Sequence, residues 1–268
     1  MLKPQSSEEV GFSGKTRSTG RPLYAKNAHE LMVAFRSLSR RARAVLVQEF
    51  VPGAGVGYFA LMSGGEVRAE FAHRRLRDVH PTGSGSSLRM SVLPDSRLRG
   101  QSQKLLRALG WHGVAMVEYR MRADGTPVFL EVNGRFWNSL ALAVHAGVDF
   151  PRLLAQLAET GTTDPLPAYR PGVRCRWMLG DFRHLIEVFR GAPAGYPGRF
   201  PGRLRTLLSF LRPHFGTHHD NFRLDDPLPE LGDWLDFALH RIPTFATRRR
   251  RSSRARKELH VQRRYSHP

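Results

Sequence analysis

Cysteine is almost absent from this chain of 268 residues, in which Cys175 is the only one. A single cysteine excludes a framework of disulfide bonds within the chain and suits a reducing compartment. Long apolar runs are also missing, and none approaches the roughly 18 residues that a membrane-spanning helix needs. The first residues, Met1-Leu2-Lys3-Pro4-Gln5, lack the apolar stretch of a secretory signal. These absences predict a cytoplasmic protein with no membrane contact.

Acidic side chains are scarce relative to basic ones, with 23 Asp and Glu against 42 Lys and Arg, a net charge of +19. Only five of the basic residues are lysine, a bias that the base composition of the gene can also produce. Residues 248–268 carry nine Lys or Arg and one acid, without apolar periodicity, which predicts a disordered tail over 246–268. We favour a solvated tail, so nucleic acid is not an expected partner. A nucleic-acid binder driven by the arginine excess remains an open alternative, as does non-specific binding to polyanions.

The remaining sequence is that of a globular protein, and its most informative segment runs from Val114 to Arg135. Asp124-Gly125 lies between apolar and β-branched runs, which is a strong signal for a tight hairpin. If these two residues form the turn, Glu118 faces Glu131 on the neighbouring strand. Two carboxylates that face each other repel, and a fold keeps such a pair when a cation lies between them.

Side chains alternate along a strand, so Glu131, Asn133 and Arg135 share one face of the predicted hairpin. Carboxylate and amide oxygens suit magnesium, which often binds together with substrate phosphates. Glu118, Glu131 and Asn133 are therefore the candidate metal ligands. The alternative is a half-exposed hairpin whose charges are simply solvated.

With these residues the chain resembles the ATP-grasp superfamily, closest to the branch of biotin carboxylase and the carbamoyl-phosphate synthase large chain. In that family a glutamate and a Glu-x-Asn-x-Arg stretch hold magnesium and the nucleotide phosphates, and Glu118 and Glu131-Val-Asn133-Gly-Arg135 match them. The resemblance covers residues 1 to about 180. It implies an α+β fold, with an antiparallel sheet, a small strand–helix–strand lobe and the nucleotide between them.

The resemblance extends to three further segments, two of which have a simpler alternative. Lys3 is similar to a lysine that contacts nucleotide phosphate, but it could be a frayed terminal residue. Gln48-Glu49-Phe50-Val51 resembles the hinge beside adenine, where the Glu49 carbonyl and the Val51 N–H are the expected contacts. Arg75 matches an arginine near the acidic substrate, although arginines also cluster by chance in this chain. Arg75 and Arg135 are the candidate catalytic residues.

The resemblance implies ATP-dependent ligation of an unidentified carboxylate through an acyl phosphate, with Mg²⁺ or Mn²⁺ as the metal. The family has a preceding domain that this sequence lacks, so we expect an N-terminally incomplete ATP-grasp domain over 1–180. A helical extension is expected over 181–245, and Arg174–Leu179 is expected to form an edge strand. The alternative function is a catalytically silent nucleotide-binding remnant, or one half of a split protein that needs a separate N-terminal domain or partner chain.

Overall fold

The computed structural model describes residues 1–6, 8–10, 16–165, 168–212 and 215–239. The chain forms two compact units, Met1–Asp220 and Asn221–Pro268. In the second unit, the Trp234 indole N–H donates to the Glu230 carboxylate at 2.7 Å. The predicted boundaries at residues 180 and 245 stay a prediction, and the basic tail over 246–268 lies outside the described residues.

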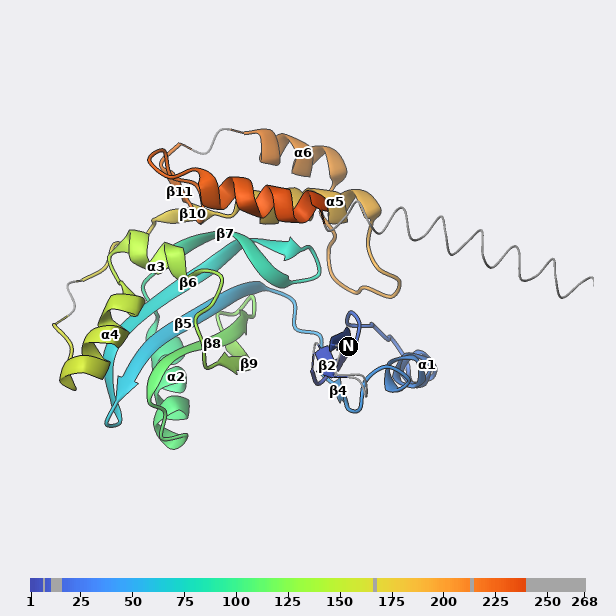
Figure 1. Ribbon diagram of the computed structural model, residues 1–268. Helices are drawn as coiled ribbons and strands as arrows, with labels where there is room; N and C mark the ends of the chain where they lie inside the picture. The colour runs from blue at the N-terminus through green and yellow to red at the C-terminus, as the bar shows by residue number, and fades with distance from the viewer. Residues whose placement is uncertain (7, 11–15, 166–167, 213–214, 240–268) are drawn as a thin grey trace, which may run out of the picture. The chain divides into compact units, whose positions relative to one another are not determined.

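A seven-stranded sheet forms the body of the first unit, in the order β11-β10-β7-β6-β5-β8-β9 (Figure 1). Neighbouring strands are antiparallel except β10 and β11, which are parallel. The strands are β5 (Ala54–Ser63), β6 (Glu66–His80), β7 (Ser84–Val92), β8 (Gly113–Met121), β9 (Pro127–Asn133), β10 (Arg174–Arg176) and β11 (Thr217–His219). The expectation of an edge strand at 174–179 was wrong, because β11 pairs outside β10.

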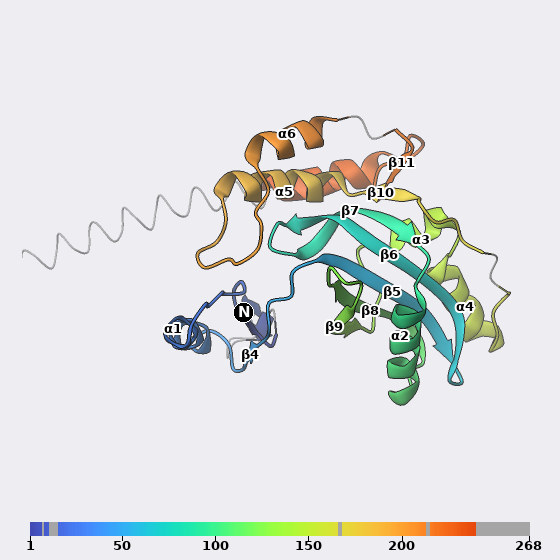
Figure 2. The same ribbon diagram turned by 180° about the vertical axis from the view of Figure 1, so that it is seen from behind.

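Helices cover both faces of this sheet because successive residues of its strands point to opposite sides. Tyr58, Ala60 and Met62 of β5 pack with Leu98 and Leu106 of α2 (Ser96–Ala108). The alternate residues Phe59 and Leu61 belong to a second cluster with α3 (Leu140–Ala146) and α4 (Phe150–Thr160). Figure 2 shows α2 and α4 from behind the sheet. The strands buried on both sides give the sheet a rigid centre.

A small strand–helix–strand lobe precedes the sheet. It consists of β1 (Leu2–Pro4), α1 (Ala28–Ser39) and β4 (Val45–Val47), with β2 (Glu8–Val10) and β3 (Thr16–Ser18) paired separately. Asn27 caps α1, because its side chain accepts a hydrogen bond from the Glu30 N–H at 2.9 Å. Leu2, Ala34 and Leu38 form the core of this lobe. The predicted α+β architecture of an antiparallel sheet and a small strand–helix–strand lobe is therefore confirmed.

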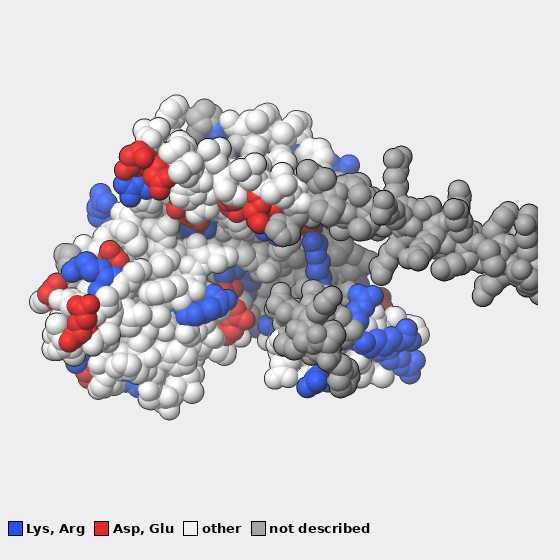
Figure 3. Space-filling view, viewed as in Figure 1, with Lys and Arg blue, Asp and Glu red and all other residues white. Residues whose placement is uncertain are grey.

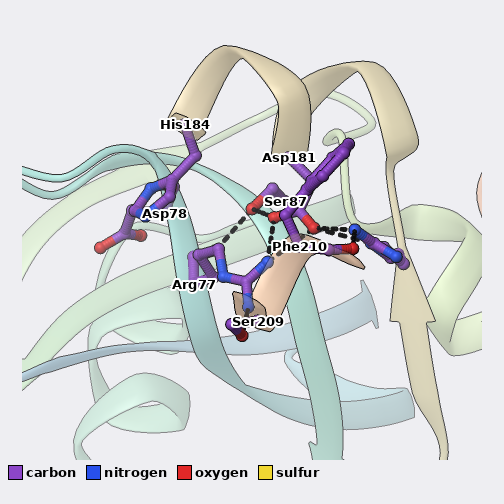
Figure 4. Close-up of polar contacts among 8 residues, drawn as sticks. Arg77, Asp78, Ser87, Asp181, His184, Ser209 and Phe210 are labelled. Carbon is purple, nitrogen blue, oxygen red and sulfur yellow. Dashed lines mark hydrogen bonds and ion pairs between the residues drawn. The ribbon is translucent and has the colours of Figure 1, made fainter. Parts of the chain in front are cut away.

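Two helices lie between β10 and β11 in the chain, α5 (Met178–Arg190) and α6 (Arg203–Leu211), and α5 packs on β6 and β7. A buried polar network fixes α5 (Figure 4). The Asp181 carboxylate accepts from Arg77 at 2.6 Å, from Arg176 Nε at 2.7 Å and from the Ser87 hydroxyl at 3.1 Å. Arg77 also donates to the Ser209 hydroxyl of α6 at 2.5 Å. Within the described ranges, no helix has the length and apolar character needed to cross a membrane.

The hairpin of β8 and β9 confirms the predicted pairing but not the predicted turn. Glu118 pairs with Glu131, yet Met121 pairs with Pro127, so the connection is five residues long rather than two. A register shift between Glu118 and Tyr119 brings the carboxylates back into alignment. The sequence signal at Asp124-Gly125 thus marks the turn region, while the bulge decides the register.

Candidate active site

Glu118 and Glu131 lie at opposed positions of β8 and β9, and Asn133 shares their face. The Asn133 amide donates to Glu131 Oε1 at 3.2 Å. Glu118 is largely buried, whereas Glu131 is exposed. Burial raises the pKa of Glu118, and the nearby charge of Glu131 raises it further, while Arg75 opposes both effects. The structure therefore brings together all three predicted metal ligands.

Arg75 reaches this pair from β6 by crossing β5, and its Nη2 lies 2.7 Å from Glu118 Oε2. Two glycines of β5 leave room for the side chains of β6 that lie over them on this face of the sheet. A Cβ at Gly55 would lie 2.6 Å from Arg75 Cδ, and a Cβ at Gly57 would lie 2.8 Å from His73 Nε2. Any larger residue at these positions would displace the side chain above it. The glycines of β5 thus allow a β6 arginine to contact a β8 glutamate.

A second carboxylate, Asp78, lies beside the same arginine. Its oxygens are 3.6 Å from Arg75 Nη1 and 3.8 Å from Arg120 Nη1. Burial raises the pKa of Asp78, and the two guanidinium groups oppose that shift. Arg120 also donates to the carbonyls of Gly53 at 2.9 Å and Gly83 at 2.6 Å. It therefore joins the two loops that border this end of the sheet.

Two buried basic side chains, His73 and Arg89, line the same face. His73 is 1% exposed, and neither of its ring nitrogens has a hydrogen-bond partner in the described part of the chain. Burial and the charges of Arg75 and Arg89 lower the pKa of His73 well below its usual value. Arg89 is fully buried and forms an ion pair with Asp220. This face of the sheet thus carries a buried imidazole whose pKa is lowered by burial and by two nearby guanidinium groups.

The residues predicted to hold the nucleotide lie on the small lobe. Lys3 of β1 pairs with Leu46 of β4. The N–H and carbonyl of Gln48 both bond to Met1, each at 2.9 Å. Beyond them, the carbonyl of Glu49 and the N–H of Val51 have no partner among the residues that the structure describes. The structure therefore leaves the two backbone groups predicted to contact adenine available.

Arg135, the other predicted catalytic residue, lies just beyond β9 and is exposed, and its Nη1 donates to the Phe136 carbonyl at 2.9 Å. The sequence patterns did not identify His73, Asp78 or Arg120 as site residues. The alternation of strand residues could have identified Arg120, because it lies two positions after Glu118 on one strand. Asp78 follows a register shift in β6, so alternation could not have placed it.

The donor set on β8 and β9 fits a hard divalent cation. Its oxygens come from two carboxylates and one amide, and the mutual repulsion of the carboxylates would be relieved by a bound cation. Within the described ranges, no group of three or more His, Cys, Asp or Glu residues is arranged to hold a metal. Magnesium at Glu118, Glu131 and Asn133 would thus need oxygen ligands from another source, such as phosphates.

On the face drawn in Figure 3, the Lys and Arg side chains of the described residues do not form one continuous basic area. Lys and Arg side chains occur there in separate groups, and Asp and Glu side chains lie beside several of them. Electrostatic attraction to a polyanion is strongest when basic side chains gather on one face.

Comparison with known protein families identifies a match over about half of the chain. Residues 41–180 match the family described as "ATP-grasp in the biosynthetic pathway with Ter operon". A search of the curated proteins found no match. The matched residues include the hinge segment, Arg75 and the β8–β9 hairpin, but not Lys3, α5 beyond residue 180, or α6.

Three of the solved structures to which the chain is similar are the following. An L-amino acid ligase from Bacillus licheniformis has 19% identity and a TM-score of 0.46, over 65% of this chain and 42% of that one. Biotin carboxylase from Campylobacter jejuni has 14% identity and a TM-score of 0.45, over 59% of this chain and 37% of that one. The phosphoribosylaminoimidazole carboxylase ATPase subunit from Aquifex aeolicus has 17% identity and a TM-score of 0.39, over 47% of this chain and 40% of that one. The chain spans less than half the length of each.

Proposed function

The chain belongs to the ATP-grasp family, and from this premise we propose that it is an ATP- and magnesium-dependent ligase that joins a carboxylate to an amine or similar nucleophile. The observation that carries the proposal is the opposed pair Glu118 and Glu131, with Asn133 on the same face and Arg75 in contact with Glu118. Phosphoryl transfer depends on positioning and charge neutralisation more than on a side-chain nucleophile, and this set supplies both.

The proposed reaction has two steps. An oxygen of the substrate carboxylate attacks the γ-phosphorus of ATP, the bond to the bridging oxygen breaks, and ADP leaves. The nucleophile then attacks the carbonyl carbon of the acyl phosphate, inorganic phosphate leaves, and the amine loses a proton. Manganese could replace magnesium, because it accepts the same oxygen ligands.

Each predicted residue has a role in this proposal. Glu118, Glu131 and Asn133 hold the metal, which neutralises charge on the phosphates. Arg75 and Arg135 neutralise the carboxylate substrate and the transferred phosphoryl group, and guanidinium groups suit such anions because they bind them in pairs of hydrogen bonds. Lys3 contacts phosphate. The Glu49 carbonyl and the Val51 N–H bind the adenine edge, with Gln48 and Phe50 on either side of Glu49.

Glu131→Gln tests the metal site. The variant keeps an oxygen that can accept from Asn133 but removes the charge that faces Glu118, so magnesium–ATP affinity should fall by about tenfold or more. Without ligand, the variant should be as stable as the parent or more stable, because a like charge has been removed. Isothermal titration calorimetry and thermal melts measure the two effects, with Glu159→Gln on the exposed side of α4 as the control.

A purely structural Glu131 would behave in the opposite way. The variant would then melt at a lower temperature without ligand and would keep the full stabilisation by magnesium–ATP. That pair of results would contradict the metal site. Equal binding of magnesium–ATP by Glu131→Gln and the parent would do so as well.

Val51→Pro tests the hinge, because it removes the N–H expected to reach adenine, while Val51→Ala keeps it. ATP affinity should fall for the proline variant and stay near that of the parent for the alanine variant. Release of ADP in the presence of a panel of carboxylic acids and an amine then separates an active ligase from the alternative. Tight ATP binding without acid-dependent ADP release would favour a nucleotide-binding remnant or a half that needs a partner.

A further inference from the structure

An aromatic cluster joins the hinge to a segment that follows α5. Three of its members are Tyr24, Phe50 and Tyr196, and all three are half-buried. The Tyr196 ring lies edge-to-face against Tyr24, with centroids 5.1 Å apart, and against Phe50, with centroids 5.6 Å apart. Tyr24 and Phe50 are 6.0 Å apart in the same geometry. A residue far along the chain therefore contacts the segment predicted to hold adenine.

The backbone beside this cluster has the hydrogen-bonding groups that the edge of a purine requires. Phe50 lies between the Glu49 carbonyl, an acceptor, and the Val51 N–H, a donor, and neither has a partner among the described residues. Adenine presents a donor and an acceptor side by side along one edge, and its flat faces stack on aromatic rings. Free backbone groups next to partly exposed rings therefore suit an adenine base.

The helix that precedes Tyr196, α5, is held by contacts with the sheet. The Asp181 network anchors the first half of α5 to β6 and β7, and the His184 ring lies 2.6 Å from the Asp78 carbonyl (Figure 4). Near the end of α5, the Glu187 carboxylate accepts hydrogen bonds from Arg21 Nη1 at 2.8 Å and from Arg21 Nη2 at 3.2 Å. The same helix thus contacts both the sheet and the segment before α1.

The chain after α5 then approaches Tyr24 closely. A Cβ at Gly195 would lie 3.1 Å from the Tyr24 carbonyl oxygen, and this glycine has a φ of +73°. Both facts favour glycine next to Tyr196. The approach of this segment to the hinge is therefore built into the local sequence.

We propose that Tyr196 forms an aromatic wall for the base of the bound nucleotide, so that the segment after α5 contributes a nucleotide-binding residue from outside the family match at 41–180. This inference rests on the proposed function. It assigns adenine recognition to two separate parts of the chain, the backbone of the hinge and a side chain nearly 150 residues later.

The test compares ATP with magnesium tripolyphosphate, which has the phosphates but no base. Tyr196→Ala should weaken ATP binding by about tenfold, the size expected for loss of one base–aromatic contact. It should leave the affinity for tripolyphosphate unchanged. Tyr196→Phe keeps the ring and should bind ATP almost as well as the parent. Calorimetric titrations of the three proteins provide the comparison, with melting curves to show that each is folded.

Four outcomes would overturn the inference. ATP affinity of a folded Tyr196→Ala equal to that of the parent would show that the ring does not touch the base. Equal losses for ATP and tripolyphosphate would show that Tyr196 only holds the lobe in place. If the parent binds tripolyphosphate but binds ATP no more tightly, the proposed contact between Tyr196 and the base is wrong, while the proposed phosphate site is unaffected. If the parent binds neither, the proposed function fails and this inference fails with it.

A photolabelling experiment keeps the inference testable even if Tyr196→Ala does not fold. The parent protein is irradiated with 8-azido-ATP and magnesium, digested with trypsin and analysed by mass spectrometry. The label should appear on the peptide of residues 191–199, which contains Tyr196, and excess ATP should prevent it. Labelling confined to other peptides would contradict the proposed position of the base.

Discussion

Removal of the Asp181 carboxylate should destabilise the protein strongly. The side chain has no exposed surface, and it accepts hydrogen bonds from Arg77, whose side chain is 12% exposed, and Arg176, whose side chain is 6% exposed. Asp181→Ala would leave both guanidinium groups buried without their counter-charge. Breaking a buried ion pair by removal of one partner costs about 3–5 kcal/mol.

That loss of free energy should be visible as a large shift in melting temperature. A change of 1 kcal/mol moves the midpoint by roughly 2–4 °C for a protein of this size, so Asp181→Ala should melt about 10 °C or more below the parent. Circular dichroism at 222 nm follows the transition. Asp225→Ala is the matched control, because it breaks an aspartate–arginine pair at the surface, and it should melt with the parent.

An apolar replacement shows whether the buried charge is the cause. Leucine at Asp181 together with methionine at both Arg77 and Arg176 should recover most of the lost stability, because no charge then remains buried without a partner. The reasoning would be refuted if Asp181→Ala, folded, melted within about 2 °C of the parent. It would also be refuted if the triple replacement melted no higher than Asp181→Ala.

Three other predictions concern the sheet. Gly57→Ala should lower the melting temperature by several degrees because its Cβ would lie 2.8 Å from His73 Nε2, whereas Gly100→Ala on α2, with open space around it, should be neutral or stabilising. Burial lowers the pKa of His73, so below about pH 6.5 the unfolded chain binds a proton that the folded chain does not. The free energy of unfolding should therefore decrease as the pH falls from about 6.5 to about 5. His73→Gln should reduce that pH dependence in urea titrations without abolishing it, because other histidines have pKa values shifted in the same direction; an unchanged slope would contradict this. Burial raises the pKa of the Cys175 thiol, so Ellman's reagent should react with it only after unfolding, and rapid reaction of the native protein would show that the thiol is accessible.

Local sequence patterns were sufficient for most of the elements. Asn27 and Glu30 predict the start of α1, and the apolar spacing of Leu98, Leu105 and Leu106 predicts α2, because capping and amphipathicity act within one or two turns of a helix. The alternation of apolar and polar residues around Glu118 and Glu131 likewise predicts two strands with the carboxylates on one face. These patterns are local, and the structure confirms the elements.

Patterns of the same kind could not predict the register or the non-local contacts. The pairing of Glu118 with Glu131 was predicted from a two-residue turn, but it results from a longer turn and a compensating bulge. Arg75 contacts Glu118 across an intervening strand, and this depends on two glycines of β5 that no local pattern connects to either residue. Registers and crossings of this kind depend on how whole strands pack.

The sequence alone determined the positions of α1, α2, β8 and β9 and the residue types on the polar face of β8 and β9, because each depends on neighbours within a few residues. Tertiary structure decided which charges meet. It paired Glu118 with Arg75, placed Asp78 beside that arginine, and enclosed Asp181 between two guanidinium groups. It also brought Tyr196 against Phe50. These contacts join residues distant in the chain, and they form only when the sheet, the lobe and α5 are folded together.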